Sequence, residues 1–305
     1  MRTGRSLFFL AALLLTACSS SGIGNGPPPS RVPATSRVVA IGDLHGDLKA
    51  AQAALLLAGA MDEEGHWVGG DMILVQTGDI LDRGDDEVEI WDLFDRLAQE
   101  ARKAGGAVYL LNGNHELMNA YQDFRYVTEG GFADFRNTPP PSSPDSAFLA
   151  LPPEEQGRAA AFLPGGPAAL RLAGQNIVQV VGRTLFVHGG VLPQNVTLGL
   201  DSINAQARAW LRGERPEPEW VRGEDSPVWA RIYSRDPDQA ACDTLCSVLE
   251  SLGLDRMVVG HTVQSSGITA FCGGRVWAID VGMAEAYEGT PEVLEIKGNS
   301  VRSLR

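Results

Sequence analysis

The segment Arg37-Val38-Val39-Ala40-Ile41-Gly42-Asp43-Leu44-His45-Gly46 shows the pattern that decides the fold of this chain. A short run of β-branched and apolar residues is followed directly by a polar cluster, and a helix-forming stretch comes next. The same order recurs after the strand-like runs at 72–75 and 107–111, which end in GDILDRG at 78–84 and GNHE at 113–116. Three successive strand–helix units predict strands of one sheet, with ligand-binding residues at their carboxyl ends.

The second half of the chain is richer in predicted strand. Residues 176–187 have the pattern of a hairpin that turns at Gly182-Arg183, and His188-Gly189-Gly190 follows it. A predicted helix near 237–252 leads to an apolar strand at 256–259, which ends in Gly260-His261-Thr262. Short strands near 268–271, 275–281 and 292–296 complete an edge. This alternation of strands and helices indicates an α/β fold.

The region between about 132 and 175 has a different composition, because it holds 8 of the 18 prolines. Regular strands do not tolerate prolines at such spacing. We therefore predict an inserted, partly helical cap over the functional site. An ordered surface loop without a function is the alternative interpretation.

Composition restricts the possible classes of function. The 305 residues are 44% hydrophobic and 21% charged, which is typical of a folded globular protein. With a net charge of −13 the chain lacks the basic character of a general nucleic-acid-binding protein, so we expect no nucleic-acid partner. An acidic chain can still act on phosphates, since bound metal ions reverse the sign of the charge inside a cleft.

The amino terminus has the pattern of an export signal. Arg2 and Arg5 precede an apolar run at 7–15 that is too short to span a bilayer. Leu15-Thr16-Ala17-Cys18 resembles a bacterial lipobox, in which cleavage before the cysteine is followed by attachment of lipid to it. We therefore expect residues 1–17 to be a lipoprotein signal peptide, with an ordinary secretory signal as the alternative.

Residues 18–36 are rich in Ser, Gly and Pro, and they predict a flexible tether between Cys18 and a folded domain over residues 37–305. The expected product is an exported bacterial lipoprotein, which its lipid would anchor to a membrane on the periplasmic or cell-surface side.

The predicted strand ends bring together side chains of the kinds that bind metal ions. They are Asp43, His45, Asp79, Asn114, His115, His188 and His261. Carboxylates, an amide oxygen and imidazoles suit borderline divalent metals such as Mn, Fe or Zn, and the lack of thiolates disfavours a structural zinc site. Seven candidates are more than one ion needs, whereas two ions that share Asp79 as a bridging ligand would use them.

The motifs GDLHG, GDILDRG, GNHE, HGG and GHT together resemble those of the calcineurin-like metallophosphoesterases. The DRG of the second motif and the glutamate of GNHE place the chain nearest the phosphoprotein phosphatase branch. Within that branch, the segments PVWARIY, RMVVGHTVQ and RVWAIDVGM are similar to those of bacterial Shewanella-like protein phosphatases. The resemblance covers roughly residues 37–296.

This resemblance implies a four-layer αββα sandwich that holds two divalent metal ions at one end. It assigns Asp43 and His45 to the first ion, Asp79 to both ions, and Asn114, His188 and His261 to the second. It further implies that Arg83 and Arg231 bind the phosphate. His115 would be the general acid, and Asp82 would orient it.

The implied activity is hydrolysis of phosphomonoesters by direct attack of a hydroxide that bridges the ions, while His115 protonates the leaving oxygen. The expected substrate is a protein phosphorylated on serine, threonine or tyrosine, or a small phosphomonoester. A nucleotide or phosphodiester hydrolase on the same scaffold is the alternative enzyme. A non-catalytic phosphate-binding protein is the alternative outside enzymes.

Cys242, Cys246 and Cys272 remain once Cys18 carries lipid. In an oxidising compartment we expect one disulfide among them. Cys242–Cys272 is the predicted pair, and Cys242–Cys246 within one helix is the alternative.

Overall fold

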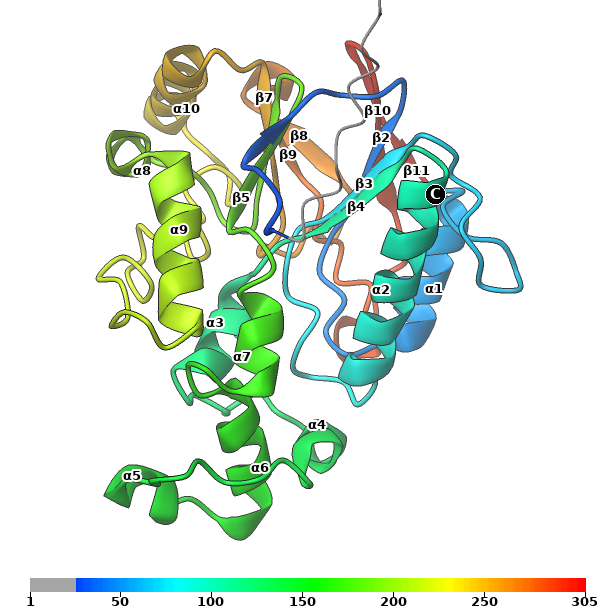
Figure 1. Cartoon of the computed structure of the whole chain (residues 1–305). Helices are drawn as coiled ribbons and strands as arrows, with labels where there is room; N and C mark the ends of the chain where they lie inside the picture. The colour runs from blue at the N-terminus through cyan, green and yellow to red at the C-terminus, as the bar shows by residue number, and fades with distance from the viewer. Residues whose placement is uncertain (1–25) are drawn as a thin grey trace, which may run out of the picture.

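A computed structural model describes residues 26–305, which form two packed β-sheets with helices on their outer sides (Figure 1). The predicted signal peptide and Cys18 lie outside the described residues. The five-stranded sheet has the order β11-β10-β2-β3-β4. Its strands are β2 (Val38–Ile41), β3 (Ile73–Gln76), β4 (Ala107–Leu110), β10 (Val293–Lys297) and β11 (Ser300–Leu304).

The second sheet has six strands in the order β1-β5-β6-β7-β9-β8. Its strands are β1 (Arg31–Val32), β5 (Val178–Val181), β6 (Thr184–Val187), β7 (Arg256–Val259), β8 (Thr269–Phe271) and β9 (Val276–Ala278). The predicted hairpin is confirmed, because β5 and β6 pair antiparallel with Val181 opposite Thr184. The first-half strands β2, β3 and β4 are parallel neighbours in one sheet, as the three strand–helix units predicted.

The short apolar runs form strands because both of their faces are covered. Along β2, Val38 and Ala40 join the cluster between the two sheets, whereas Val39 and Ile41 face the cluster under the helices. Strands buried on both faces consist of continuous hydrophobic residues rather than alternating ones. This explains why the deciding segment contains four successive apolar residues.

Helices complete the outer layers of the sandwich. In Figure 1, helices α1 and α2 lie beside the five-stranded sheet, and helices α8 to α10 lie beside the six-stranded sheet. Their bounds are α1 (Leu48–Leu57), α2 (Glu87–Lys103), α8 (Pro193–Leu198), α9 (Leu200–Leu211) and α10 (Gln239–Leu252). Two short 3₁₀ helices, η1 (Cys272–Gly274) and η2 (Glu285–Tyr287), lie in the carboxyl-terminal third. No helix within residues 26–305 is long and apolar enough to cross a membrane.

The predicted flexible tether does not extend to residue 36. β1 pairs in parallel with β5, and its residue Arg31 lies opposite Val180. Just before it, the carbonyl oxygens of Pro28 and Pro29 accept hydrogen bonds from the side-chain amides of Asn176 (Nδ2) and Gln179 (Nε2). The composition of residues 18–36 predicted a solvated linker. In the structure, β1 instead provides hydrogen-bond partners for the edge strand β5. The composition of a segment does not show whether a sheet edge elsewhere in the chain lacks a partner.

The proline-rich region forms four helices, α4 (Glu129–Phe135), α5 (Ser146–Leu149), α6 (Pro153–Phe162) and α7 (Pro167–Leu172). Two of its prolines stand at the first position of α6 and α7, where a missing N–H costs no hydrogen bond. The region projects from the body at one end (Figure 1) and contributes no side chain to the pocket at the strand ends. It is therefore helical, as predicted, but it is not a cap over the site.

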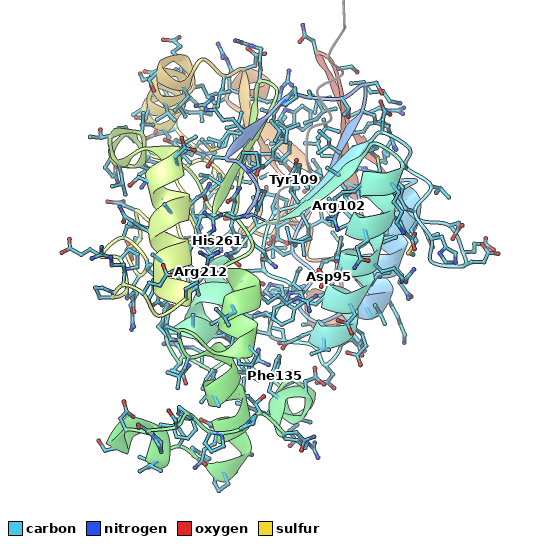
Figure 2. All side chains as sticks on the ribbon, viewed as in Figure 1. Asp95, Arg102, Tyr109, Phe135, Arg212 and His261 are labelled. Atoms are coloured by element: carbon cyan, nitrogen blue, oxygen red, sulfur yellow. A yellow bond between two sulfur atoms is a disulfide. The ribbon has the colours of Figure 1, made fainter. Side chains whose placement is uncertain are left out.

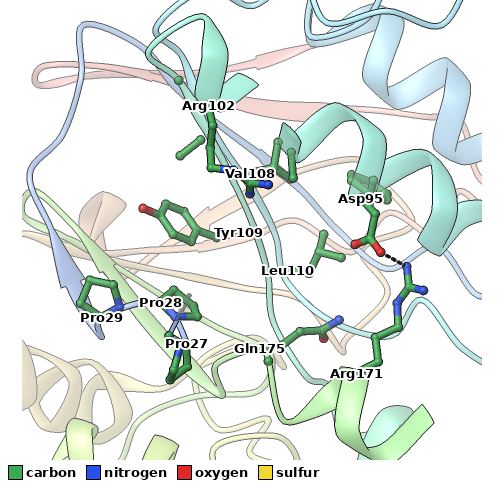
Figure 3. Close-up of a pocket in the computed structure, with 16 residues that line it drawn as sticks. Pro27, Pro28, Pro29, Asp95, Arg102, Val108, Tyr109, Leu110, Arg171 and Gln175 are labelled. Atoms are coloured by element: carbon green, nitrogen blue, oxygen red, sulfur yellow. Dashed lines mark ion pairs between the residues drawn. The ribbon is translucent and has the colours of Figure 1, made fainter. Parts of the chain in front are cut away.

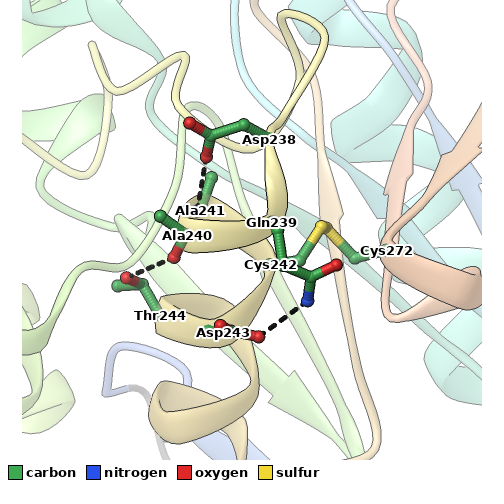
Figure 4. The surroundings of a disulfide bond; sticks show 8 residues. All are labelled: Asp238, Gln239, Ala240, Ala241, Cys242, Asp243, Thr244 and Cys272. Atoms are coloured by element: carbon green, nitrogen blue, oxygen red, sulfur yellow. Dashed lines mark hydrogen bonds between the residues drawn. A yellow bond between two sulfur atoms is a disulfide. The ribbon is translucent and has the colours of Figure 1, made fainter.

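A disulfide joins Cys242 in the first turns of α10 to Cys272 in η1, which is the predicted pair (Figure 4). Asp238 caps the same helix, since its Oδ1 accepts from the amide of Ala241 at 2.8 Å. Cys246 is the free cysteine in the described part of the chain.

A cavity of about 860 Å³ runs along the edge strand β4, and none of the polar motifs at the strand ends lines it (Figure 3). Pro27 to Pro29 and Tyr109 line one part of it. Elsewhere in its wall, Arg171 of α7 forms an ion pair with Asp95 of α2 at 2.7 Å.

Candidate active site

The predicted ligands converge because strands of both sheets end at the same place. Parallel strands β2, β3 and β4 deliver Asp43, Asp79 and the first turn of α3 (Asn114–Ala120). Strands β6 and β7, also parallel, deliver His188 and His261 from the second sheet. His261 lies near the middle of the molecule, above the proline-rich helices (Figure 2).

Asp79 stands at the centre of this cluster. Its Oδ2 lies 3.1 Å from Nε2 of His188, 3.8 Å from Nε2 of His115 and 3.9 Å from Nε2 of His45. Two groups of potential ligand atoms share it: His45 and His115 on one side, and His188 and His261 on the other. Asp79 is thus the residue that the two groups have in common, whereas the first group contains His115, the predicted general acid, in addition to the predicted ligand His45.

The imidazoles of His45 and His188 are held through Nδ1, and their Nε2 atoms lie toward the other candidate ligands. Nδ1 of His45 donates to the carbonyl oxygen of Leu81 at 3.1 Å, and Nδ1 of His188 donates to that of Thr77 at 3.0 Å. A carbonyl can only accept, so Nδ1 carries the proton and Nε2 keeps its lone pair, which is the usual arrangement of metal-binding histidines. Nε2 of His261 is buried without a hydrogen-bond partner. The donor set therefore fits divalent metal ions.

Burial sets the charge of these groups. It lowers the pKa of His45 to about 4, with the neighbouring His115 acting in the same direction. It raises the pKa of Asp43 well above its usual value, and the charges of Asp280 and Asp79 add to this effect. Neutral imidazoles beside crowded carboxylates suit a site whose positive charge comes from bound ions.

The turns that carry these residues adopt a conformation that is uncommon outside glycine. His45, Asp79, Asp82, Arg83 and His261 all have φ between 45° and 70°. Strain of this kind persists where the surrounding structure fixes it, and it is concentrated at functional sites. The polar clusters are thus positioned by sharp turns at the strand ends.

Glu116, the last residue of GNHE, fixes the turn that carries Asp79. Its carboxylate accepts hydrogen bonds from the amides of Asp79 (2.8 Å), Ile80 (2.8 Å) and Gly113 (2.7 Å). Burial, together with the charge of Asp79, raises its pKa to about 7. Only glycine fits at position 113, because a Cβ there would collide with Oδ1 of Asp79. Sequence reasoning used Glu116 only as a family marker and missed this role.

His115 lies next to the cluster with a carboxylate behind it. Its Nδ1 donates to Oδ2 of Asp82 at 2.6 Å, and its Nε2 faces the pocket. Burial alone would lower the pKa of His115, but the charge of Asp79 and the bond to Asp82 outweigh it, so the pKa is raised. A protonated imidazole held in this way suits a proton donor.

The predicted phosphate-binding arginines both line the pocket. Arg83 stacks on Tyr126, with its Cζ 4.2 Å from the ring centroid, and lies 5.2 Å from the ring of Tyr287. Arg231 donates from Nη1 to the carbonyl oxygen of His261 at 2.5 Å.

The pocket has a volume of about 70 Å³ and brings most of the predicted site residues together. Its lining comprises Asp43, His45, Asp79, Arg83, Asn114, His115, Tyr126, Trp229, Arg231, His261, Asp280 and Tyr287. His188 and Asp82 stand behind this lining and contact it through Asp79 and His115. Sequence reasoning missed Tyr126 and Tyr287, which no motif links to the strand ends, and it missed Asp280, although this residue lies in the quoted segment RVWAIDVGM just after β9.

Comparison with known proteins identifies the family. Residues 36–265 match the model of the calcineurin-like phosphoesterases. The chain belongs to this family. The calcineurin-like phosphoesterase described here is 38% identical to Shewanella-like protein phosphatase 2 of Arabidopsis thaliana, over 87% of this chain and 76% of that one. It is 26% identical to Shewanella-like protein phosphatase 1 of Plasmodium berghei, over 88% of this chain and 74% of that one.

Solved structures support the same placement of this phosphoesterase. The cold-active protein-tyrosine phosphatase of a psychrophilic Shewanella species superimposes with a TM-score of 0.73, at 25% identity, over 92% of this chain and 83% of that one. A Saccharomyces cerevisiae serine/threonine phosphatase shares the fold, with a TM-score of 0.58 at 15% identity. The predicted family, fold class and metal-dependent phosphatase activity are confirmed.

Proposed function

We propose that this metal-dependent phosphatase removes phosphoryl groups from proteins. The shape of the site carries the proposal: the pocket of about 70 Å³ is far smaller than a typical small-molecule site of roughly 300–1,000 Å³. A pocket of this size suits a phosphoryl group, and the rest of the substrate would lie outside it. The protein phosphatases among its relatives support the same substrate class.

The adjoining surface disfavours a nucleotide. A cavity of about 430 Å³ shares His45 and Arg83 with the pocket and has a strongly acidic lining. The carboxylates are those of Asp47, Asp85, Asp86 and Glu285, against the basic residues Lys49 and Arg83. Such a surface repels the further phosphates of a nucleotide, whereas a peptide chain carries no such charge.

For the metal centre we propose the ligands expected from the sequence. Asp43 and His45 would hold one ion, Asn114, His188 and His261 would hold the other, and Asp79 would serve both. Mn, Fe or Zn suits this donor set. When bound, two such ions make water nucleophilic near neutral pH and neutralise phosphoryl oxygens.

The chain itself supplies orientation and a proton. Arg83 and Arg231 hold the phosphoryl oxygens, and a guanidinium does so through a planar fork of donors. His115 delivers the proton at Nε2 to the leaving oxygen, while Asp82 holds Nδ1. Tyr126 and Tyr287 restrict the position of Arg83.

The test is a substrate panel with enzyme loaded separately with Mn, Fe and Zn. It includes phosphoserine, phosphothreonine and phosphotyrosine peptides, p-nitrophenyl phosphate, bis-p-nitrophenyl phosphate and dinucleoside polyphosphates. We expect the highest kcat/KM with phosphopeptides. Preference for the diester or the dinucleotide would overturn the proposal in favour of the nucleotide or phosphodiester alternative.

We further propose that the enzyme works as an exported lipoprotein, held at a membrane through Cys18. The Leu15-Thr16-Ala17-Cys18 pattern and the basic, then apolar, residues before it support this location. The disulfide between Cys242 and Cys272 is consistent with it, because such bonds persist in oxidising compartments.

A further inference from the structure

One arginine of the proline-rich region lies entirely inside the protein. The side chain of Arg158, in α6, is 0% exposed, and its guanidinium packs against the rings of Phe135 and Phe162, with Cζ 5.2 and 4.9 Å from their centroids. Buried arginines are rare and need partners for their charge and for their five N–H donors. Arg158 has such partners, and they lead to the active site.

The partners of Arg158 surround Asp82. Nη2 donates to Oδ1 of Asp82 at 3.2 Å, and Nε donates to Oδ1 of Asn119 at 2.7 Å. Asn119 in turn donates from Nδ2 to the same Oδ1 of Asp82 at 2.9 Å. One oxygen of the Asp82 carboxylate is therefore held by two donors, while the other accepts from His115.

Glu87, at the start of α2, completes the arrangement. Arg158 donates to both of its oxygens, with distances of 2.6 Å to Oε2 and 3.0 Å to Oε1. Oε1 of Glu87 also accepts from the backbone amide of Asp82 at 2.6 Å. Arg158 thus fixes the side chain of Asp82 directly and its backbone through Glu87.

We propose that Arg158 is a positioning residue for the proton donor and that the proline-rich region exists in part to supply it. The guanidinium orients the Asp82 carboxylate, and this carboxylate sets the direction of the His115 ring. A lysine could not replace it, because only the planar fork contacts Asn119, Glu87 and Asp82 together. The inference rests on the proposed role of His115 as general acid.

A purely structural role predicts a different result. Removing a brace between α6 and the body would lower the fraction of active enzyme, and all substrates would then lose rate equally. If the proton donor is misdirected, the loss of rate depends on the substrate. It is largest for a substrate whose leaving oxygen is strongly basic, because such an oxygen needs protonation most. Since Arg158 does not line the pocket, KM should change little in either case.

The variants are chosen to keep the protein folded. Arg158→Met is combined with Glu87→Gln, so that no glutamate charge stays buried without a partner. Arg158→Lys is the second variant, since it keeps the positive charge and loses the fork. Arg171→Met is the matched control, because Arg171 of α7 also ties the proline-rich region to α2, through Asp95, without contacting Asp82 (Figure 3).

The measurement is kcat and KM for a series of alkyl and aryl phosphates of increasing leaving-group pKa, with bound metal and melting temperature determined for each protein. For both Arg158 variants we expect kcat with alkyl phosphates to fall about 10–100-fold, which is part of the ~10²–10⁴-fold that a general acid contributes. The fall with p-nitrophenyl phosphate should be smaller, with metal content unchanged. Arg171→Met should keep the wild-type dependence on leaving-group pKa.

If the Arg158 variants lose the same factor in kcat with every leaving group, the inference is overturned. It is also overturned if Arg171→Met shows the same change in the dependence of kcat on leaving-group pKa. His115→Asn separates this failure from that of the proposed function. If His115→Asn steepens the dependence and the Arg158 variants do not, only the role of Arg158 is wrong. If His115→Asn leaves the slope unchanged, the general acid and its positioning residue are both wrong. A wild-type enzyme inactive on every phosphomonoester would contradict the proposed function itself.

Discussion

At the residue scale, two adjacent residues at one strand end have different side-chain contacts, which suit two different functions. Asn114 and His115 are adjacent, yet Asn114 Oδ1 lies 2.9 Å from Nε2 of His188, while His115 turns its Nδ1 to Asp82. The helical start of α3 sends the two side chains in different directions. This geometry supports metal binding by one residue and proton transfer by the other.

The role of His115 predicts a specific kinetic change. His115→Asn should retain both metal ions and slow alkyl phosphate hydrolysis by about 10²–10⁴-fold, which is the usual contribution of a general acid. Hydrolysis of p-nitrophenyl phosphate should slow less, because nitrophenolate leaves with little protonation. The measurement is kcat against leaving-group pKa, with the metal content of each protein. Loss of an ion from the variant would instead make His115 a ligand, as its proximity to His45 and Asp79 allows.

Gly113 provides a test of the central carboxylate in which no candidate ligand is itself replaced. Gly113→Ala should displace Asp79, since the new Cβ would meet its Oδ1, and metal and activity should be lost together. Gly223→Ala is the matched control, because a Cβ there meets no atom closer than 3.9 Å. Metal analysis and turnover of the two folded variants provide the comparison. Normal metal content in Gly113→Ala would show that the position of Asp79 does not control the ions.

At the scale of elements, a covalent link holds the outer helix α10 against the 3₁₀ turn η1 (Figure 4). The bond closes a loop of 30 residues that contains β7 and the turn with His261. A disulfide restricts the unfolded chain and so stabilises the folded one, mostly by about 2–4 kcal/mol. It therefore supports a strand that carries a site residue.

Removing this bond should weaken the fold more than the chemistry. Cys242→Ser with Cys272→Ser should lower the free energy of unfolding by about 2–4 kcal/mol, while kcat of the folded enzyme stays close to wild type. Cys246→Ser, which alters the free cysteine of the same helix, should change stability by less than about 0.5 kcal/mol. Urea denaturation of the three proteins measures the difference. Equal stability of the double variant and the wild type would mean that packing alone holds α10.

At the scale of the whole molecule, the amino-terminal segment enters the described fold near a sheet edge. β1 is the edge strand beside β5, and Gly26, the first described residue, lies at the cavity along β4. Eight residue steps separate Cys18 from Gly26, so this stretch could span at most about 29 Å, at roughly 3.3–3.6 Å each. A lipid at Cys18 would therefore keep the enzyme close to the membrane surface.

The proposed anchor is tested with the full-length chain in a bacterial host. Wild-type protein should incorporate labelled lipid and fractionate with membranes. Cys18→Ser should lose the label, whereas Cys246→Ser should keep it, since it removes a cysteine elsewhere in the chain. A wild-type protein that is soluble and unlabelled would exclude the lipoprotein assignment and favour an ordinary secretory signal.

The sequence by itself determined most of the strands, their order along the chain and the polar clusters that follow them, whereas β1 and β11 were not predicted. These features are local: apolar runs of four or five residues, glycines at sharp turns and polar side chains directly after them. The same local information predicted the candidate ligands from Asp43 to His261, which the structure brings together, and the motifs predicted the family, which is confirmed. The site could be predicted because parallel strands necessarily place their carboxyl ends together.

Only the tertiary structure revealed what surrounds and supports the site. Arg158 lies 76 residues from Asp82, and Tyr287 is further still from Arg83, so no spacing in the sequence connects them. Composition suggested a tether through residue 36 and a cap at 132–175. The predicted tether ends in strand β1, and the predicted cap does not line the pocket. A sheet edge pairs with a strand, and a buried charge pairs with another charge, according to their positions in space. These contacts form only when the layers of the fold pack together. The local pattern of residues does not specify that packing.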